Sequence, residues 1–211
     1  QPRSRGLGDV YKRQALANNA LVALTASGFE ADGPEGAYQT GAAMCGGTVY
    51  GSHLKSGYKR LELRSDDRVT VLERTNARHL TPEQLGGTIC DMVTVDVSFI
   101  SLKKIYPAIH RILKDGGELI TLIKPQFEAK PNQLGKNGIL RDPAGTLPPL
   151  LDDIFDVAAE NELQLLGLTV SPIHGTNGNV EYLAHYRHTA EPVGCDRQAM
   201  IEAALSLQPD V

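Results

Sequence analysis

The sequence predicts an α/β protein built on a doubly wound, mostly parallel sheet. From residue 68 onward, apolar segments of strand length alternate with segments that have helical spacing, as in parallel strands joined by crossover helices. The last two strand-like segments are separated only by a turn-forming cluster, which indicates an antiparallel edge strand. Because ligands bind beyond the carboxyl ends of the strands in such sheets, we expect the functional site there.

The first part of this region contains two predicted strands. In residues 68–74, "RVTVLER", β-branched and polar side chains alternate, which favours a short strand. Residues 91–100, "DMVTVDVSFI", form an apolar run that stops in a loop. Between them, "TPEQ" at residues 81–84 has the threonine–proline pattern of a helix start.

Residues 101–117 predict a helix that packs one apolar face on the sheet. Gly116 and Gly117 mark the end of this predicted helix. The residues of its apolar face recur at helical spacing: Leu102, Ile105, Ile109, Ile112 and Leu113.

The remaining segments continue the alternation. "ELITLIK", residues 118–124, is nearly uninterrupted in its apolar character, which is typical of a strand covered on both faces. Pro148 and Pro149 stand where the next helix is expected to begin. The later elements follow in order: a helix over residues 149–163, strands over residues 163–173 and 179–187, and a terminal helix over residues 196–207 capped by Asp196.

The first 60 residues do not fit this pattern. "DVYKRQ", which ends at Gln14, resembles the translation of a transposase end sequence used in preparing sequencing libraries, so we exclude residues 1–14 from fold reasoning. The alternative is a basic, disordered arm. Residues 15–60 are rich in glycine and follow no period of 2 or 3.6, and we assign only "GTVYGSHL", residues 47–54, as a strand that survives there.

Composition excludes several classes of protein. The 211 residues carry a net charge of −4, so a nucleic-acid partner would need a local basic patch. The three cysteines form no CxxC pair, which favours a reducing compartment over a disulfide framework. No apolar run approaches the roughly 20 residues that span a bilayer. We therefore expect a cytoplasmic protein without a membrane partner.

Polar side chains stand at or just past three successive predicted strand ends. Glu73, Asp96 and Lys124 hold these positions. Because the carboxyl ends of parallel strands meet at one edge of a sheet, the architecture places all three near the expected ligand site.

Five segments carry a family resemblance. "SDDRVTVLERTNAR", "VTVDVSFISL", "LIKPQFEA", "GKNGILRDP" and "SPIHGTNGNVEYL" resemble the TlyA family of RNA ribose methyltransferases, which is related to the FtsJ-type enzymes. They occur in the family's order and approximate spacing. The resemblance implies a Rossmann-like fold that uses S-adenosylmethionine to methylate a ribose 2′-hydroxyl, commonly in ribosomal RNA. Relatives are often labelled haemolysins.

The resemblance also implies roles for particular residues. By motif, the family's catalytic aspartate, second lysine and glutamate fall on Asp96, Lys124 and Glu181. The family's first lysine has no credible counterpart, because Lys12 lies in the adapter-like segment. Contacts with the cofactor or nucleotide are implied for a second group of residues, in which Phe99 could instead belong to the core: Glu73, Asn76, Asp96, Ser98 and Phe99.

The chemistry accounts for these residue types. A ribose hydroxyl is a poor nucleophile at neutral pH, so a neighbouring group must take or share its proton during methyl transfer. Lys124 is the candidate, with Asp96 to orient it and complement a cationic donor, and Glu181 to hold it from the last strands. Pro125 forces the chain out of the sheet, so Lys124 ends its strand.

The loop after Lys124 is a candidate RNA contact. Lys130, Lys136 and Arg141 would form a phosphate-contacting rim, although solvated loop charges explain them equally well. The histidines show no spacing that predicts a metal site, so we expect none.

The region that should bind the cofactor departs from the family pattern. The expected glycine-rich turn after a first strand is missing, and His53 stands where an acidic residue is expected. Either residues 23–60 are scrambled, which would remove the central strand, or the donor pocket has changed. We therefore expect an N-terminally truncated methyltransferase domain over residues 15–189, irregular over 15–60, with a tail over residues 190–211. The alternatives are an inactive RNA-binding module and, less consistent with the composition, a membrane-active haemolysin.

Overall fold

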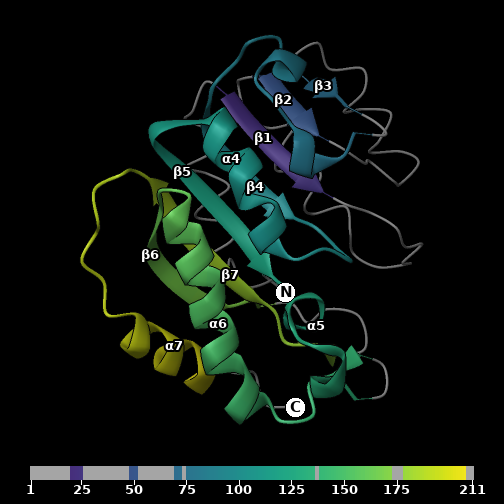
Figure 1. The fold of residues 1–211 in the computed structure, drawn as a ribbon, viewed down its shortest axis with the longest axis vertical. Helices are drawn as coiled ribbons and strands as arrows, with labels where there is room; N and C mark the ends of the chain where they lie inside the picture. The colour runs from purple at the N-terminus through teal and green to yellow at the C-terminus, as the bar shows by residue number, and fades with distance from the viewer. Residues whose placement is uncertain are drawn as a thin grey trace, which may run out of the picture.

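The computed structural model contains one seven-stranded sheet with helices packed on it (Figure 1). It describes residues 20–25, 48–51, 69–72, 75–135, 138–172 and 178–207. For the strands within the first three ranges, only the backbone is described. The strand order is β3-β2-β1-β4-β5-β7-β6. The strands are β1 (Ala20–Thr25), β2 (Thr48–Gly51), β3 (Val69–Val71), β4 (Cys90–Asp96), β5 (Leu113–Ile123), β6 (Leu163–Val170) and β7 (Tyr182–His188).

The helices fill the connections between these strands. The α-helices are α4 (Tyr106–Ile112), α5 (Pro125–Glu128), α6 (Pro143–Glu160) and α7 (Arg197–Ser206). Short 3₁₀ turns complete the connections: η1 (Ala77–His79), η2 (Glu83–Leu85), η3 (Leu102–Lys104) and η4 (Pro131–Gln133). Figure 1 shows α4 and α6 crossing in front of the sheet, with α7 beside the lower part of α6. Among the described residues, no helix combines the length and hydrophobicity that crossing a bilayer requires.

The sheet is mostly parallel and has antiparallel pairing at one edge, as predicted. Strands β1 to β5 pair in parallel, and β7 runs antiparallel to both β5 and β6. The edge strand β6 pairs antiparallel as predicted, and β7, which runs against the other strands, lies between β6 and β5. A short β6–β7 connection makes the two strands antiparallel neighbours, but it does not determine which of them also pairs with β5.

The irregular N-terminal region contributes two strands. The strand expected in residues 47–54 is present as β2, and β1, which we did not predict, lies between β2 and β4. The expectation that a scrambled segment removes the central strand is therefore wrong. The segment "ALVALT" has strand length and apolar character, but the glycine-rich residues that follow it obscured the pattern.

Two predicted helix boundaries were also wrong. The helix over residues 101–117 is only α4, preceded by η3, because β5 already begins at Leu113. Gly116 and Gly117 lie within β5, where Gly116 adopts a φ of 71° and a Cβ on Gly117 would meet Leu113 at 2.7 Å. They lie where the register between β4 and β5 shifts, and they do not end a helix.

The next helix begins earlier than predicted. Helix α6 starts at Pro143, and Asp142 caps it by accepting a hydrogen bond from the amide of Gly145 at 3.1 Å. Pro148 and Pro149 lie inside the helix, beyond the first four amides that lack an intrahelical acceptor, so each removes one backbone hydrogen bond. The predicted terminal helix is confirmed as α7, with Asp196 as its cap.

The core lies between the sheet and helices α4 and α6. Tyr106 of α4 and Tyr186 of β7 are fully buried, and their hydroxyl oxygens lie 3.1 Å apart. Phe155 of α6 packs against the Tyr186 ring. This core holds the carboxyl ends of β4 and β5 in fixed positions, and the predicted site residues follow from these ends.

Candidate active site

Asp96 and Lys124 meet because their strands are parallel neighbours. Asp96 is the last residue of β4, and Lys124 follows directly after β5. The pairing of Val95 with Thr121 brings the carboxyl ends of these two strands to the same edge. The Lys124 Nζ atom lies 2.7 Å from Oδ1 of Asp96, so the predicted neighbours form a direct ion pair.

The Lys124 ammonium group is largely enclosed. Its side chain is 14% exposed, and it also donates a hydrogen bond to the Ser98 hydroxyl at 3.2 Å. An ammonium group has three N–H donors, so the two contacts leave one for a further acceptor. Ser98 thus joins the site as predicted by position, although its observed partner is Lys124.

Glu181 approaches the pair from β7. It immediately precedes Tyr182, which pairs with Ile123, so the antiparallel register places Glu181 beside Lys124. The side chain is 7% exposed. Burial raises the pKa of Glu181, the charge of Lys124 partly opposes that rise, and the Asp96 carboxylate adds to it.

Helix α5 supports the site, and its contribution was not predicted. Pro125 begins α5, which turns the chain away from the sheet directly after Lys124. The Gln126 side-chain amide donates to Glu181 at 3.5 Å. Glu128 accepts hydrogen bonds from the Ser101 hydroxyl at 2.6 Å and the Leu102 amide at 2.7 Å. These contacts tie the loop after β4 to the segment after β5.

The loop after β4 presents an aromatic ring to solvent. Phe99 is 62% exposed and adopts a φ of 60°, a conformation that non-glycine residues rarely adopt. Its ring lies 4.9 Å from that of Phe127 in α5, tilted by 48°. Phe99 is therefore not a core residue, and the alternative weighed from the sequence is wrong.

Other predicted residues do not join this cluster or cannot be placed. Asn76 is exposed and caps η1 by accepting a hydrogen bond from the Arg78 amide. Lys130 is exposed, and Arg141 donates to the Leu134 carbonyl within its own loop at 2.7 Å. Several predictions concern residues outside those that the structure describes: residues 1–14, the glycine-rich segment 26–47, His53, Glu73 and Lys136.

Comparison with known proteins identifies the family. The profile of the FtsJ-like methyltransferases matches residues 34–188. The chain belongs to the FtsJ-like methyltransferase family. This match confirms the methyltransferase fold expected from the resemblance.

Individual FtsJ-like relatives agree with this assignment. YqxC of Bacillus subtilis (strain 168) is 40% identical over 154 residues, 72% of this chain and 54% of that protein. The 16S/23S rRNA (cytidine-2'-O)-methyltransferase TlyA of Mycobacterium tuberculosis (strain ATCC 25618 / H37Rv) is 42% identical over 133 residues, 62% of this chain and 49% of that enzyme. The chain thus spans about half the length of these relatives.

A solved structure matches nearly the whole FtsJ-like domain. The crystal structure of a "putative hemolysin" from Lactococcus lactis superposes with a TM-score of 0.76 at 30% identity, covering 94% of this chain and 96% of that one.

Proposed function

We propose that this chain methylates a ribose 2′-hydroxyl of RNA, with ribosomal RNA as the substrate class and S-adenosylmethionine as the methyl donor. The observation that carries the proposal is the Lys124–Asp96 ion pair, closed on one side by Glu181, at the carboxyl edge of an FtsJ-like sheet. The TlyA enzyme, 42% identical over the matched part, acts on a cytidine 2′-oxygen in rRNA, as its name states. A ribosomal substrate would place the protein in the cytoplasm.

The residues at this edge fit a cationic methyl donor. The register pairs Thr25 with Asp96, so the carboxyl ends of β1 and β4 are adjacent, and ligands of such sheets bind outside these ends. The Asp96 carboxylate, 26% exposed, supplies a negative charge at this point. When bound, S-adenosylmethionine supplies a methyl group on a positively charged sulfur. We propose that Asp96 and Ser98 face that group, and that Glu73 and Asn76 serve its adenosine end.

Lys124 acts on the hydroxyl that receives the methyl group. The Lys124 ammonium group, paired with Asp96, offers its remaining N–H to the ribose oxygen, which positions that oxygen for attack. As the new C–O bond forms, the hydroxyl oxygen must lose its proton. For this step the ion pair must open and Lys124 must first lose one proton to solvent. The neutral Lys124 nitrogen then accepts the hydroxyl proton. Glu181 and Gln126 limit where the lysine side chain can move.

RNA would approach over the Phe99 ring. An exposed aromatic side chain is a stacking surface for an unpaired base, and Phe99 lies one residue from Ser98, which contacts Lys124. Lys130 and Arg141 are exposed on the segment that follows α5, and with Lys136 they are proposed to contact phosphates. These local charges are needed because the whole chain carries a net charge of −4.

The direct test has two stages. Calorimetry with S-adenosylmethionine establishes donor binding by the folded chain. Incubation of ribosomal subunits with donor labelled in its methyl group, followed by nuclease digestion and mass spectrometry, should then yield a 2′-O-methylnucleoside. A label found on a base would refute the ribose assignment. RNA binding without donor binding would favour the alternative of an inactive RNA-binding module.

A further inference from the structure

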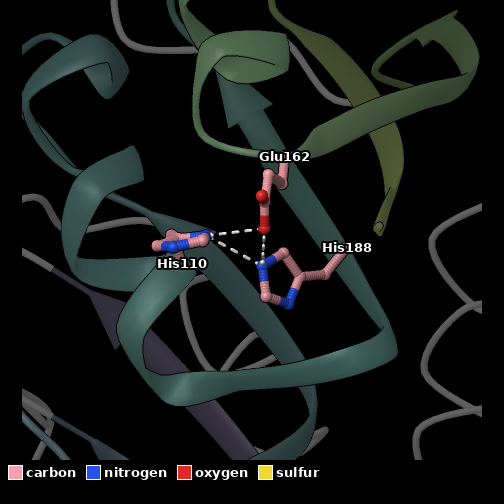
Figure 2. A group of neighbouring side chains, drawn as sticks. All are labelled: His110, Glu162 and His188. Atoms are coloured by element: carbon pink, nitrogen blue, oxygen red, sulfur yellow. Dashed lines mark hydrogen bonds and ion pairs between the residues drawn. The ribbon is translucent and has the colours of Figure 1, made fainter. Parts of the chain in front are cut away.

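Two histidines and a glutamate gather at the end of the sheet opposite the Lys124 site. His110 lies in the last turn of α4, Glu162 between α6 and β6, and His188 at the end of β7. Figure 2 shows their side chains converging. The His110 Nδ1 atom is 2.9 Å from Nε2 of His188, and the Glu162 Oε2 atom is 3.6 Å from the former and 3.7 Å from the latter.

The hydrogen bond of His188 to the backbone orients its ring for metal binding. Its Nδ1 atom lies 3.0 Å from the Lys114 carbonyl oxygen. A carbonyl oxygen only accepts, so Nδ1 carries the hydrogen, and the lone pair of neutral Nε2 faces His110 and Glu162. A backbone carbonyl that holds the second ring nitrogen in this way is the usual outer partner of a metal-binding histidine.

We propose that His110, Glu162 and His188 bind a divalent transition metal ion, with zinc the best match to the ligand types. Zinc–ligand bonds of about 2.0–2.1 Å in tetrahedral geometry place the ligand atoms about 3.3 Å apart. The three observed separations, 2.9, 3.6 and 3.7 Å, bracket this value. Imidazole nitrogen and carboxylate oxygen are both zinc ligands.

The proton balance of binding is simple. Without metal, the His110 Nδ1 atom donates to Nε2 of His188, since the latter has no hydrogen. With metal, Nδ1 of His110 presents its lone pair, and the hydrogen moves through solvent to Nε2 of the same ring. The His110 side chain is 41% exposed, so this exchange is open to water. Glu162 is 46% exposed, which leaves a side of the site where water can complete the coordination.

The backbone holds the third ligand at the site. Glu162 adopts a φ of 60°, which costs a non-glycine residue free energy. Its carbonyl accepts a hydrogen bond from the Thr189 amide at 2.7 Å, and its amide donates to Ala159 at 2.9 Å. The first of these bonds joins the residue after His188 directly to Glu162, so two of the proposed ligands are fixed relative to each other before a metal binds.

This site is separate from the proposed methyl-transfer chemistry. Glu181 and His188 flank the two ends of β7, seven residues apart, which is about 23 Å along a strand. A metal here would tie α4 to the β6 and β7 ends and would stabilise the fold without contacting the reacting groups. Its ligands come from three separate elements, which explains why spacing along the sequence predicted no metal site.

Zinc binding by the whole, untagged chain tests the proposal. After dialysis against a chelator, Zn²⁺ is titrated by calorimetry, and Co²⁺ is added as a visible-absorption probe of tetrahedral coordination. Glu162→Gln and His110→Ala remove the two more exposed ligands, and His79→Ala, an exposed histidine of η1, is the matched control. We expect one zinc equivalent in the unaltered chain and the control, and binding weakened by about tenfold or more in each cluster variant.

Two results would overturn the proposal. In the first, a chain that circular dichroism shows to be folded gives no heat of zinc binding and no visible absorption on addition of Co²⁺. The other is equal zinc affinity in the cluster variants and the His79→Ala control, which would place the metal elsewhere. A zinc-dependent rise in melting temperature that is lost in Glu162→Gln would support stabilisation of the fold by a metal at this site.

Discussion

The Nζ atom of Lys124 lies 2.7 Å from Oδ1 of Asp96 because parallel strands β4 and β5 end at the same edge of the sheet. The pair is partly enclosed, so its geometry is not that of a freely solvated surface ion pair. Its surroundings hold the lysine in place, which the proposed methyl transfer to a hydroxyl requires.

Lys124→Ala removes the nitrogen that is proposed to contact the ribose hydroxyl. We expect the initial rate of methyl transfer to fall by about 10²- to 10⁴-fold, the usual contribution of a proton-transfer group. Lys124→Arg keeps the charge but cannot act as a base, so an equally slow Arg variant would assign proton acceptance to Lys124. Lys114→Ala removes a lysine whose ion pair with Asp91 is more exposed and should leave the rate unchanged. An unaltered rate in Lys124→Ala would remove this residue from the mechanism.

Asp96→Asn keeps the side-chain volume and removes the charge. We expect donor affinity and the rate each to fall by about tenfold or more, because the negative charge facing the donor and the lysine's partner are lost together. Calorimetry with S-adenosylmethionine and initial rates measure the two effects. Asp91→Asn, at the opposite end of β4, is the matched control. Wild-type donor affinity in Asp96→Asn would contradict the role in donor binding.

Glu181→Gln should make the folded protein more stable at neutral pH. Burial raises the pKa of Glu181 above 4.5, so the folded state binds this proton more tightly than the unfolded state. At pH values above the raised pKa, the ionised Glu181 carboxylate therefore lowers the stability of the folded state. The gain from glutamine should shrink as the pH falls and vanish below about 4.5, where the carboxyl is protonated in both states. Denaturant unfolding at several pH values measures it. A gain that does not change with pH would show that the charge is not the cause.

Phe99→Ala should weaken RNA binding without destabilising the fold. Stacking of one base on an aromatic ring contributes about 1–3 kcal/mol, so we expect the KM for RNA to rise by about tenfold. Because Phe99 is 62% exposed, the unfolding free energy should change little. Ile89→Ala, an apolar residue that is 45% exposed, controls for loss of surface hydrophobicity. If both variants bind RNA alike, Phe99 is not a stacking surface.

The buried tyrosine pair predicts a non-additive stability effect. Tyr106→Phe and Tyr186→Phe each leave the other hydroxyl without its partner at 3.1 Å, and each should cost about 1–3 kcal/mol of unfolding free energy. The double variant leaves neither hydroxyl and should cost less than the sum of the two. Urea unfolding of the three variants completes the cycle, and strict additivity would show that the two hydroxyl groups do not interact.

Sequence reasoning identified the elements whose signal is local. The apolar run of β4, the strand before Pro125, and the Asp196 cap of α7 were all predicted. The meeting of Asp96 with Lys124 followed from the parallel arrangement. Each of these predictions depends on spacing within one segment or on the general rule that parallel strands end together.

The errors concern relationships between distant residues. The position of β7 beside β5 was not predicted because it depends on which strand pairs with the free edge, and β1 lies among residues whose composition masked its strand. The start of α6 at Pro143 depends on the Asp142 cap, which is a weaker signal than the two later prolines. The meeting of His110 with His188 depends on how α4 packs against the end of β7, so no pattern along the sequence predicted it.

The insertion of β7 between β5 and β6 also determines when the sheet can be completed during synthesis of the chain. Strand β6 reaches the sheet only through β7, so a chain still attached to the ribosome carries an unpaired β5 edge until residues 182–188 have emerged. That edge strand carries four apolar side chains, Leu119, Ile120, Leu122 and Ile123, and open apolar edges recruit other strands. Premature termination before β7 should therefore give an aggregating product, and any chaperone that protects this chain would act on the β5 edge.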